Sequence, residues 1–161
     1  MEVNVTNMDF NKVTIKDASG NVHEYDLEEE LTINRHDLRK ELEEQSSKYM
    51  FWTGLLERVR ANLEVAEREL EFVESELYEP IRVKLRQTMG GTSNPTKAQI
   101  EAMINQQNSY QEYRKRVEEA SYQVKRLAYI VKAFEQRKDM LVQISTSDRK
   151  QREYEQALKQ I

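Results

Sequence analysis

Basic side chains flank a glycine-rich stretch near the middle of the chain. Arg82, Lys84 and Arg86 precede Gly90-Gly91, Lys97 follows it, and acidic residues become sparse around this loop. Lysine and arginine attract phosphate groups, and a glycine loop lets them adapt to a flexible strand. The pattern predicts an anion-binding tip, although an ordinary solvated loop has the same composition.

A second basic group lies beside two aromatic residues. It consists of Arg114, Lys115 and Arg116, with Tyr110 and Tyr113 next to it. Single-stranded nucleic acid is bound by such mixtures, because cations contact phosphates while bases stack on aromatic rings. Both tyrosines also lie on an apolar helical stripe, where a place in the core is the commoner role. Together with the basic residues at the loop, these three cations are the predicted DNA-binding residues.

Patterns for catalysis and metal binding are missing. The sequence has no P-loop, GxGxxG, GxSxG or HExxH motif, and it has no cysteine. A calcium-loop spacing runs from Asp17 to Glu28, but Val22 stands where the sharp bend of such a loop needs glycine. We therefore expect a protein that is not an enzyme and that holds no metal and no cofactor.

Two long heptad patterns must position the basic residues. Apolar residues at alternating spacings of four and three form a seam along one face of a helix. The first seam is Leu38, Leu42, Gln45, Tyr49, Trp52, Leu56, Val59, Leu63, Ala66, Leu70, Val73 and Leu77. The second is Tyr110, Tyr113, Val117, Ala120, Val124, Leu127, Val131, Phe134, Lys138 and Leu141. Helix-breaking residues at 89–95 separate them, which predicts a mainly α fold built on a long antiparallel αα-hairpin, coiled-coil-like in its packing.

The chain divides at about residue 33. Residues 1–33 form an N-terminal element in which Val13 and Ile15 alternate with polar residues, a turn follows, and His23, Tyr25 and Leu27 alternate again. This pattern predicts a small β-hairpin, to which residues 3–5 add a short third strand. Residues 34–161 form the helical hairpin.

Capping residues set the expected helix boundaries. Asn34 fits the N-cap of the first helix, and Thr96 with Gln99 makes a capping box for a second helix that runs to about Gln151 or beyond. Pro80 either kinks the first helix or ends it near Glu79. Residues 81–88 are then a distorted helix end or an extended arm, and the sequence leaves both open.

Composition excludes several classes of protein. The chain has 161 residues, 34% of them charged and 38% hydrophobic, which suits an elongated or oligomeric helical protein. No apolar run reaches the roughly 20 residues of a membrane span, and nothing resembles a secretory leader, so we expect a cytoplasmic protein.

The charge is distributed unevenly along the chain. Residues 1–80 carry 9 basic and 20 acidic side chains, a net −11, and residues 81–161 carry 16 and 9, a net +7. Pairing along the hairpin is one explanation of this asymmetry.

The two most apolar stretches face each other when the chain is folded back about Thr92. They are Tyr49–Leu56 and Ala128–Phe134, here called the apolar belt, and each has apolar residues outside its seam as well. A two-helix hairpin cannot bury such a belt alone, so we expect a homo-oligomer, with the N-terminal hairpin as the alternative cover. The predicted oligomer contacts are Phe51, Trp52, Leu55, Tyr129, Ile130 and Phe134.

The chain resembles the UvsY-like recombination mediators of tailed bacteriophages. The resemblance covers residues 45–150 and rests on Tyr49-Met50-Phe51-Trp52, on the passage through Ile81-Arg82 into the glycine-rich loop, and on residues 133–141. It implies a ring-forming protein of the host cytoplasm that binds single-stranded DNA and helps a recombinase displace a single-strand-binding protein. Tyr78-Glu79-Pro80 departs from the basic stretch expected before the loop. The rival hypothesis is a coiled-coil phage assembly chaperone or scaffold whose belt binds a protein client.

Overall fold

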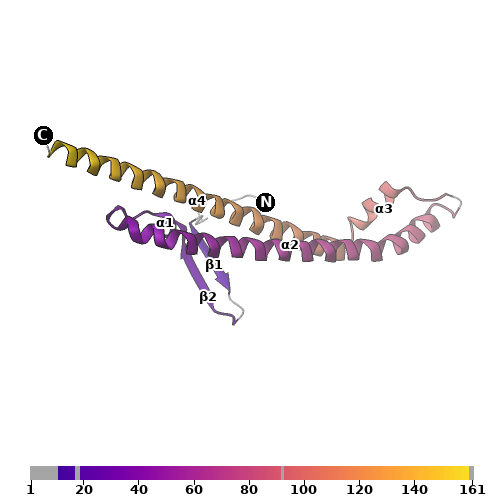
Figure 1. The fold of residues 1–161 in the computed structure, drawn as a ribbon. Helices are drawn as coiled ribbons and strands as arrows, with labels where there is room; N and C mark the ends of the chain where they lie inside the picture. Colours follow the sequence, from indigo (N-terminus) through magenta and orange to yellow (C-terminus); the bar gives the residue numbers. More distant parts are fainter. Residues whose placement is uncertain (1–10, 17–18, 92, 160–161) are drawn as a thin grey trace. The chain divides into compact units, whose positions relative to one another are not determined.

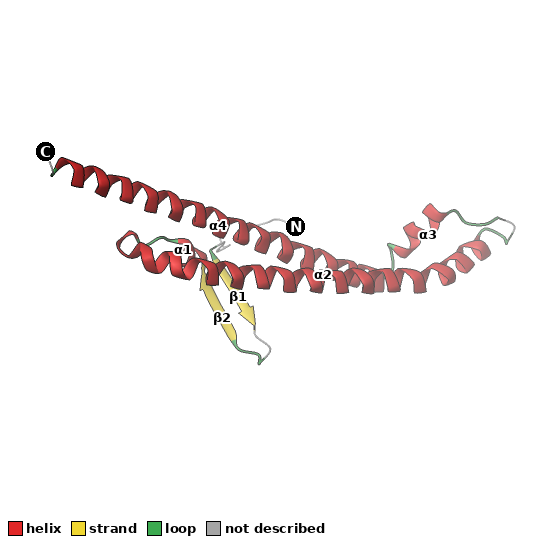
Figure 2. Ribbon diagram, in the orientation of Figure 1, coloured by secondary structure: helices red, strands yellow, loops and turns green. Residues whose placement is uncertain are grey.

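The computed structural model describes residues 11–16, 19–91 and 93–159 and is mainly helical (Figure 1). Its elements are strands β1 (Lys12–Lys16) and β2 (Val22–Asp26), helix α1 (Leu27–Leu31), the 3-10 turn η2 (Arg35–Asp37), and helices α2 (Leu38–Thr88), α3 (Lys97–Ile104) and α4 (Asn108–Leu158). The long helices α2 and α4 run antiparallel and pack against each other, as the two seams predicted (Figure 2). The chain forms two compact units, residues 1–49 with 132–161 (the first unit) and residues 50–131 (the second unit).

The N-terminal hairpin of the first unit has the predicted alternation. β1 and β2 pair antiparallel, with Val13 opposite Tyr25 and Ile15 opposite His23. Leu27, expected on the second strand, instead begins α1. The cause is Asp26, whose carboxylate accepts hydrogen bonds from the backbone N–H groups of Glu28 (2.9 Å) and Glu29 (3.3 Å) and so caps a helix. The expected third strand lies outside the described residues.

Caps also set the start of α2. The side chain of Asn34 accepts a bond from the N–H of His36, 3.0 Å away, so the predicted N-cap is confirmed for η2, and Asp37 in turn accepts from the N–H of Lys40 at 3.2 Å. α2 then begins at Leu38.

A hydrogen bond between α2 and α4 agrees with the predicted fold-back. The hydroxyl of Tyr49 on α2 donates to Glu135 on α4 at 3.0 Å. These two residues are equally far from position 92 along the chain, as the fold-back predicted.

A buried arginine replaces a predicted seam residue in the first unit. Arg137 is buried, whereas Lys138, which the heptad count placed in the seam, is exposed. Arg137 donates to the side chains of Gln45 and Glu41 and to the backbone oxygens of Leu31 (3.2 Å) and Thr32 (3.4 Å). These acceptors come from α2 and from the C-terminal end of α1, so one guanidinium joins both elements to α4.

In the second unit, α2 continues through Pro80 to Thr88. The residue after the proline explains why. Ile81 is buried in a small core with Ile100 and Ile104 of α3, against which Leu77, Leu85, Met103 and Tyr110 pack. Burial of that face stabilises the last two turns of α2, so the helical alternative for residues 81–88 is correct.

The predicted second helix is not continuous. The capping box of Thr96 and Gln99 is present, but α3 ends at Ile104, and residues 105–107 separate it from α4. Amide side chains satisfy backbone groups at the break. Gln107 Nε2 donates to the carbonyl of Met103 at 3.0 Å, and Gln111 Nε2 donates to that of Asn105. The expectation of one helix from Thr96 onward is therefore wrong.

Candidate nucleic-acid interface

The predicted anion-binding tip is built by the end of α2, the loop after it and α3, all in the second unit. The α2 helix ends in a glycine cap, in which Gly90 N–H donates to the carbonyl of Gln87 at 3.2 Å and Gly91 N–H to that of Arg86 at 2.9 Å. Gly90 and Gly91 have φ angles of 78° and 76°, which only glycine adopts without strain. This cap and the isoleucine core hold the loop against the end of α2.

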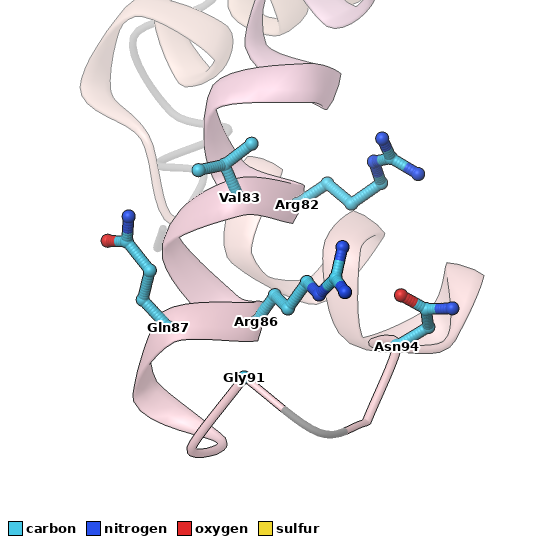
Figure 3. A pocket seen from close by; sticks show the side chains of 6 residues that line it. All are labelled: Arg82, Val83, Arg86, Gln87, Gly91 and Asn94. Carbon is cyan, nitrogen blue, oxygen red and sulfur yellow. The ribbon is translucent and has the colours of Figure 1, made fainter.

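A hollow of about 330 Å³ lies at this tip, here called the tip hollow. Its lining consists of Arg82, Val83, Arg86, Gln87, Gly91 and Asn94 (Figure 3). Arg82 and Arg86 are one helical turn apart and extend to the same side, with the guanidinium of Arg86 directed toward Asn94. The structure therefore brings together two of the four cations predicted at the loop.

The charge around the tip hollow is positive. Between Glu79 and Glu101 the sequence has no acidic residue. Arg82 donates to Glu79 Oε1 at 2.7 Å, and this hydrogen bond, followed by the negative charge of the same carboxylate, raises the pKa of Arg82. Within the described residues, Arg86 has no acidic partner, so its guanidinium is available to an anion.

The other two cations near the loop lie outside the hollow. Lys84 is exposed on α2, where two residues of separation turn it about 200° from Arg82. Lys97 pairs with Glu101 at 3.4 Å. Both add positive charge to the tip without lining its hollow.

The second predicted basic group is paired with glutamates. Arg114 lies 3.2 Å from Glu118, Lys115 lies 3.9 Å from Glu119, and Arg116 lies 3.8 Å from Glu69. The Arg116 guanidinium also stacks 4.8 Å from the centre of the Tyr113 ring. Tyr110 packs on the isoleucine core. The core role is therefore correct for Tyr110, and each of the three cations in this group has an acidic partner.

Two amide side chains of the tip hollow, those of Gln87 and Asn94, were not predicted from the sequence as site residues. Gln87 and Asn94 line the tip hollow and add neutral donors and acceptors to its two arginines. Their position beside a glycine-rich, basic loop was the available signal. Among the described residues no group of His, Cys, Asp and Glu is arranged to hold a metal ion.

The predicted oligomer contacts divide into buried and exposed residues. Trp52 (1% exposed), Ile130 and Phe134 (0%) are buried within the single chain, and Leu55 is half-buried. These three predicted contacts are therefore covered by the chain itself. Phe51 and Tyr129 are 42% and 75% exposed, so the described part of the chain leaves these two aromatic side chains at the surface.

The fold and this site define an antiparallel helical hairpin with a basic, amide-containing tip. No family model, curated protein or solved structure matches the chain. None of the helices, over the residues described, has the length and apolar character required to cross a membrane.

Proposed function

We propose that this protein binds single-stranded DNA through its tip and acts, without catalysis, as a recombination mediator. The observation that carries the proposal is the pair Arg82 and Arg86 beside a hollow in a segment free of acidic residues. Arginine presents planar, paired donors that match the oxygens of a phosphate group.

The shape of the site favours a flexible strand. The tip hollow, of about 330 Å³, has room for one phosphate with its neighbouring sugar or base. A single strand can bend into such a recess, whereas a duplex holds its phosphates on a stiff, convex surface. The amides of Gln87 and Asn94 are suited to base edges or sugar oxygens.

The mediator role requires more than one subunit, because one tip offers few contacts. A homo-oligomer that presents several tips to one strand would bind through their summed contacts. The recombinase, the single-strand-binding protein and the host cytoplasm as location follow from the resemblance to the UvsY-like mediators and are part of this proposal.

A salt titration with a fluorescent oligo-dT strand tests DNA binding. Each phosphate neutralised on a single strand contributes about 0.7 to the slope of log affinity against log salt. Arg82→Ala with Arg86→Ala should lower the affinity and reduce the slope by about 1.4 for each tip that contacts the strand.

The matched control is Lys97→Ala, which removes a cation that is already paired with Glu101 and lies outside the hollow. It should change the slope less than either arginine substitution. An unchanged slope and affinity in the double arginine variant would remove the tip hollow from DNA binding.

A coiled-coil assembly chaperone or scaffold is the second candidate. It is favoured by an open groove of about 550 Å³ in the first unit, lined in part by Leu42, Tyr49, Phe134 and Leu141. Leu42 is 43% exposed although it occupies a seam position. Failure of the wild-type chain to bind the oligonucleotide even at low salt would favour this candidate.

A further inference from the structure

The tip hollow contains an arginine that is already bound to a carboxylate of the same helix. Arg82 Nη2 lies 2.7 Å from Glu79 Oε1, and the two side chains are 49% and 60% exposed. Glu79 does not line the hollow, whereas Arg82 does. The guanidinium therefore stands between a hollow suited to phosphate and a carboxylate that occupies part of its hydrogen-bonding capacity.

We infer that Glu79 competes with phosphate for Arg82 and thereby holds the affinity of the tip below what its two arginines would otherwise give. This inference rests on the proposed function, since the competing ligand is the phosphodiester of a single strand. Arg86, which has no acidic partner among the described residues, makes the first contact, and Arg82 joins after exchanging its carboxylate for a phosphate oxygen.

Local packing keeps the competing pair in place. Ile81 lies between Glu79 and Arg82 in sequence and is buried against α3, which fixes the rotation of this turn of α2. Residues three apart on a helix lie on neighbouring positions of its surface, so Glu79 and Arg82 meet without bending the backbone. The raised pKa of Arg82, caused first by its hydrogen bond to Glu79, agrees with a carboxylate that stabilises the charged guanidinium.

The effect should be modest because both side chains are solvated. Exposed ion pairs are weak, and exchange of one acceptor for another recovers most of the interaction. Glu79→Gln should therefore tighten oligo-dT binding about two- to fivefold at low salt. The salt slope should stay close to that of the wild type, because Arg82 contacts a phosphate in both proteins once it has left residue 79.

Glu76→Gln is the matched control. Glu76 is exposed on α2, three residues before Glu79, and has no ion-pair partner within the described residues. Its substitution changes the net charge by the same amount without releasing an arginine. Both glutamines remain on an exposed helical surface, and circular dichroism should report unchanged helicity for both variants.

A double-mutant comparison separates release of Arg82 from a general charge effect. In an Arg82→Gln background, Glu79→Gln should improve binding no more than Glu76→Gln does. Equal effects of the two glutamine substitutions in the wild-type background would overturn the inference and leave DNA binding at the tip intact. Absence of oligo-dT binding by the wild type and by Glu79→Gln at low salt would overturn the proposed function and the inference together.

Discussion

At the scale of single residues, the buried side chain of Arg137 is held by four acceptors. Its donors meet the carboxylate of Glu41, the amide of Gln45 and the carbonyls of Leu31 and Thr32, and Gln45 Nε2 in turn donates to the carbonyl of Phe134 at 2.8 Å. Polar residues at buried seam positions fix the register of paired helices. We attribute the alignment of α2 with α4 in the first unit to this network.

Removal of the arginine should destabilise the fold strongly. Arg137→Met removes the guanidinium from which Glu41 and Gln45 accept hydrogen bonds in a largely buried place, so the free energy of unfolding should fall by about 3 kcal/mol. Urea denaturation followed by circular dichroism measures the change.

Lys138→Met is the control, because Lys138 is adjacent and exposed. It should change the free energy of unfolding by less than about 0.5 kcal/mol. Equal effects of the two substitutions would mean that the Arg137 network contributes nothing particular to stability.

The sequence could predict the seams but not this arginine. Neighbouring residues are about 100° apart on a helix, so Arg137 and Lys138 lie on opposite sides of the stripe through Phe134 and Leu141, and a heptad count does not decide which of them faces α2. Arg137 does so because Glu41 and Gln45, which are distant in sequence, supply acceptors for its guanidinium. Glu41 is correspondingly partly buried, whereas its neighbour Leu42 is exposed.

At the scale of elements, local sequence signals were sufficient to predict where helices start but not where they continue or break. Capping chemistry placed the starts of η2 and α3 because a side chain close in sequence supplies the missing acceptor. The continuation of α2 through Pro80 depends on contacts with Ile100 and Ile104, which are distant in sequence, so local rules could not decide it. The break at residues 105–107 contains neither glycine nor proline, so the sequence carries no helix-breaking signal there.

The glycine cap of α2 yields a prediction with an internal control. Gly90→Ala places a side chain at a φ of 78°, and it should lower the free energy of unfolding by about 1 kcal/mol. No atom lies within 4 Å of the added Cβ, so the effect comes from the backbone alone.

Gly54→Ala should have the opposite sign. Gly54 lies within α2, its added Cβ also meets nothing within 4 Å, and alanine in a helix interior is favoured by about 0.5–1 kcal/mol. Thermal unfolding of both variants checks the pair. Stabilisation by Gly90→Ala would contradict the role of this glycine as a cap.

At the scale of the whole molecule, ion pairs between the long helices account for only part of the charge difference between residues 1–80 and residues 81–161. Glu69–Arg116 and Glu41–Arg137 join α2 to α4, but Arg39, Arg60, Arg114 and Arg149 pair within their own helices. Pairing along the hairpin therefore explains only part of the asymmetry. The acid-free tip is the part that remains open to an anionic partner.

Self-association remains the central prediction for the whole chain. Phe51 and Tyr129 are exposed aromatic residues of the apolar belt, so a second copy is the cover that we expect for them. Light scattering should find a homo-oligomer at micromolar concentration. Tyr129→Glu should dissociate it, because a carboxylate in an apolar contact is unpaired and desolvated. Tyr129 is 75% exposed, so the single chain should tolerate this change.

Phe72→Glu provides the comparison. Phe72 is 61% exposed on α2 and lies outside the belt, so this substitution should leave the oligomer intact. Dissociation should also weaken oligo-dT binding at constant salt, because a strand then meets one tip instead of several, and linked sites gain about 10²–10⁴ in avidity. Oligomer size and oligo-dT affinity should therefore fall together in Tyr129→Glu and remain unchanged in Phe72→Glu. A monomeric wild type that still binds the strand tightly would separate DNA binding from assembly, and the ring model would then be wrong.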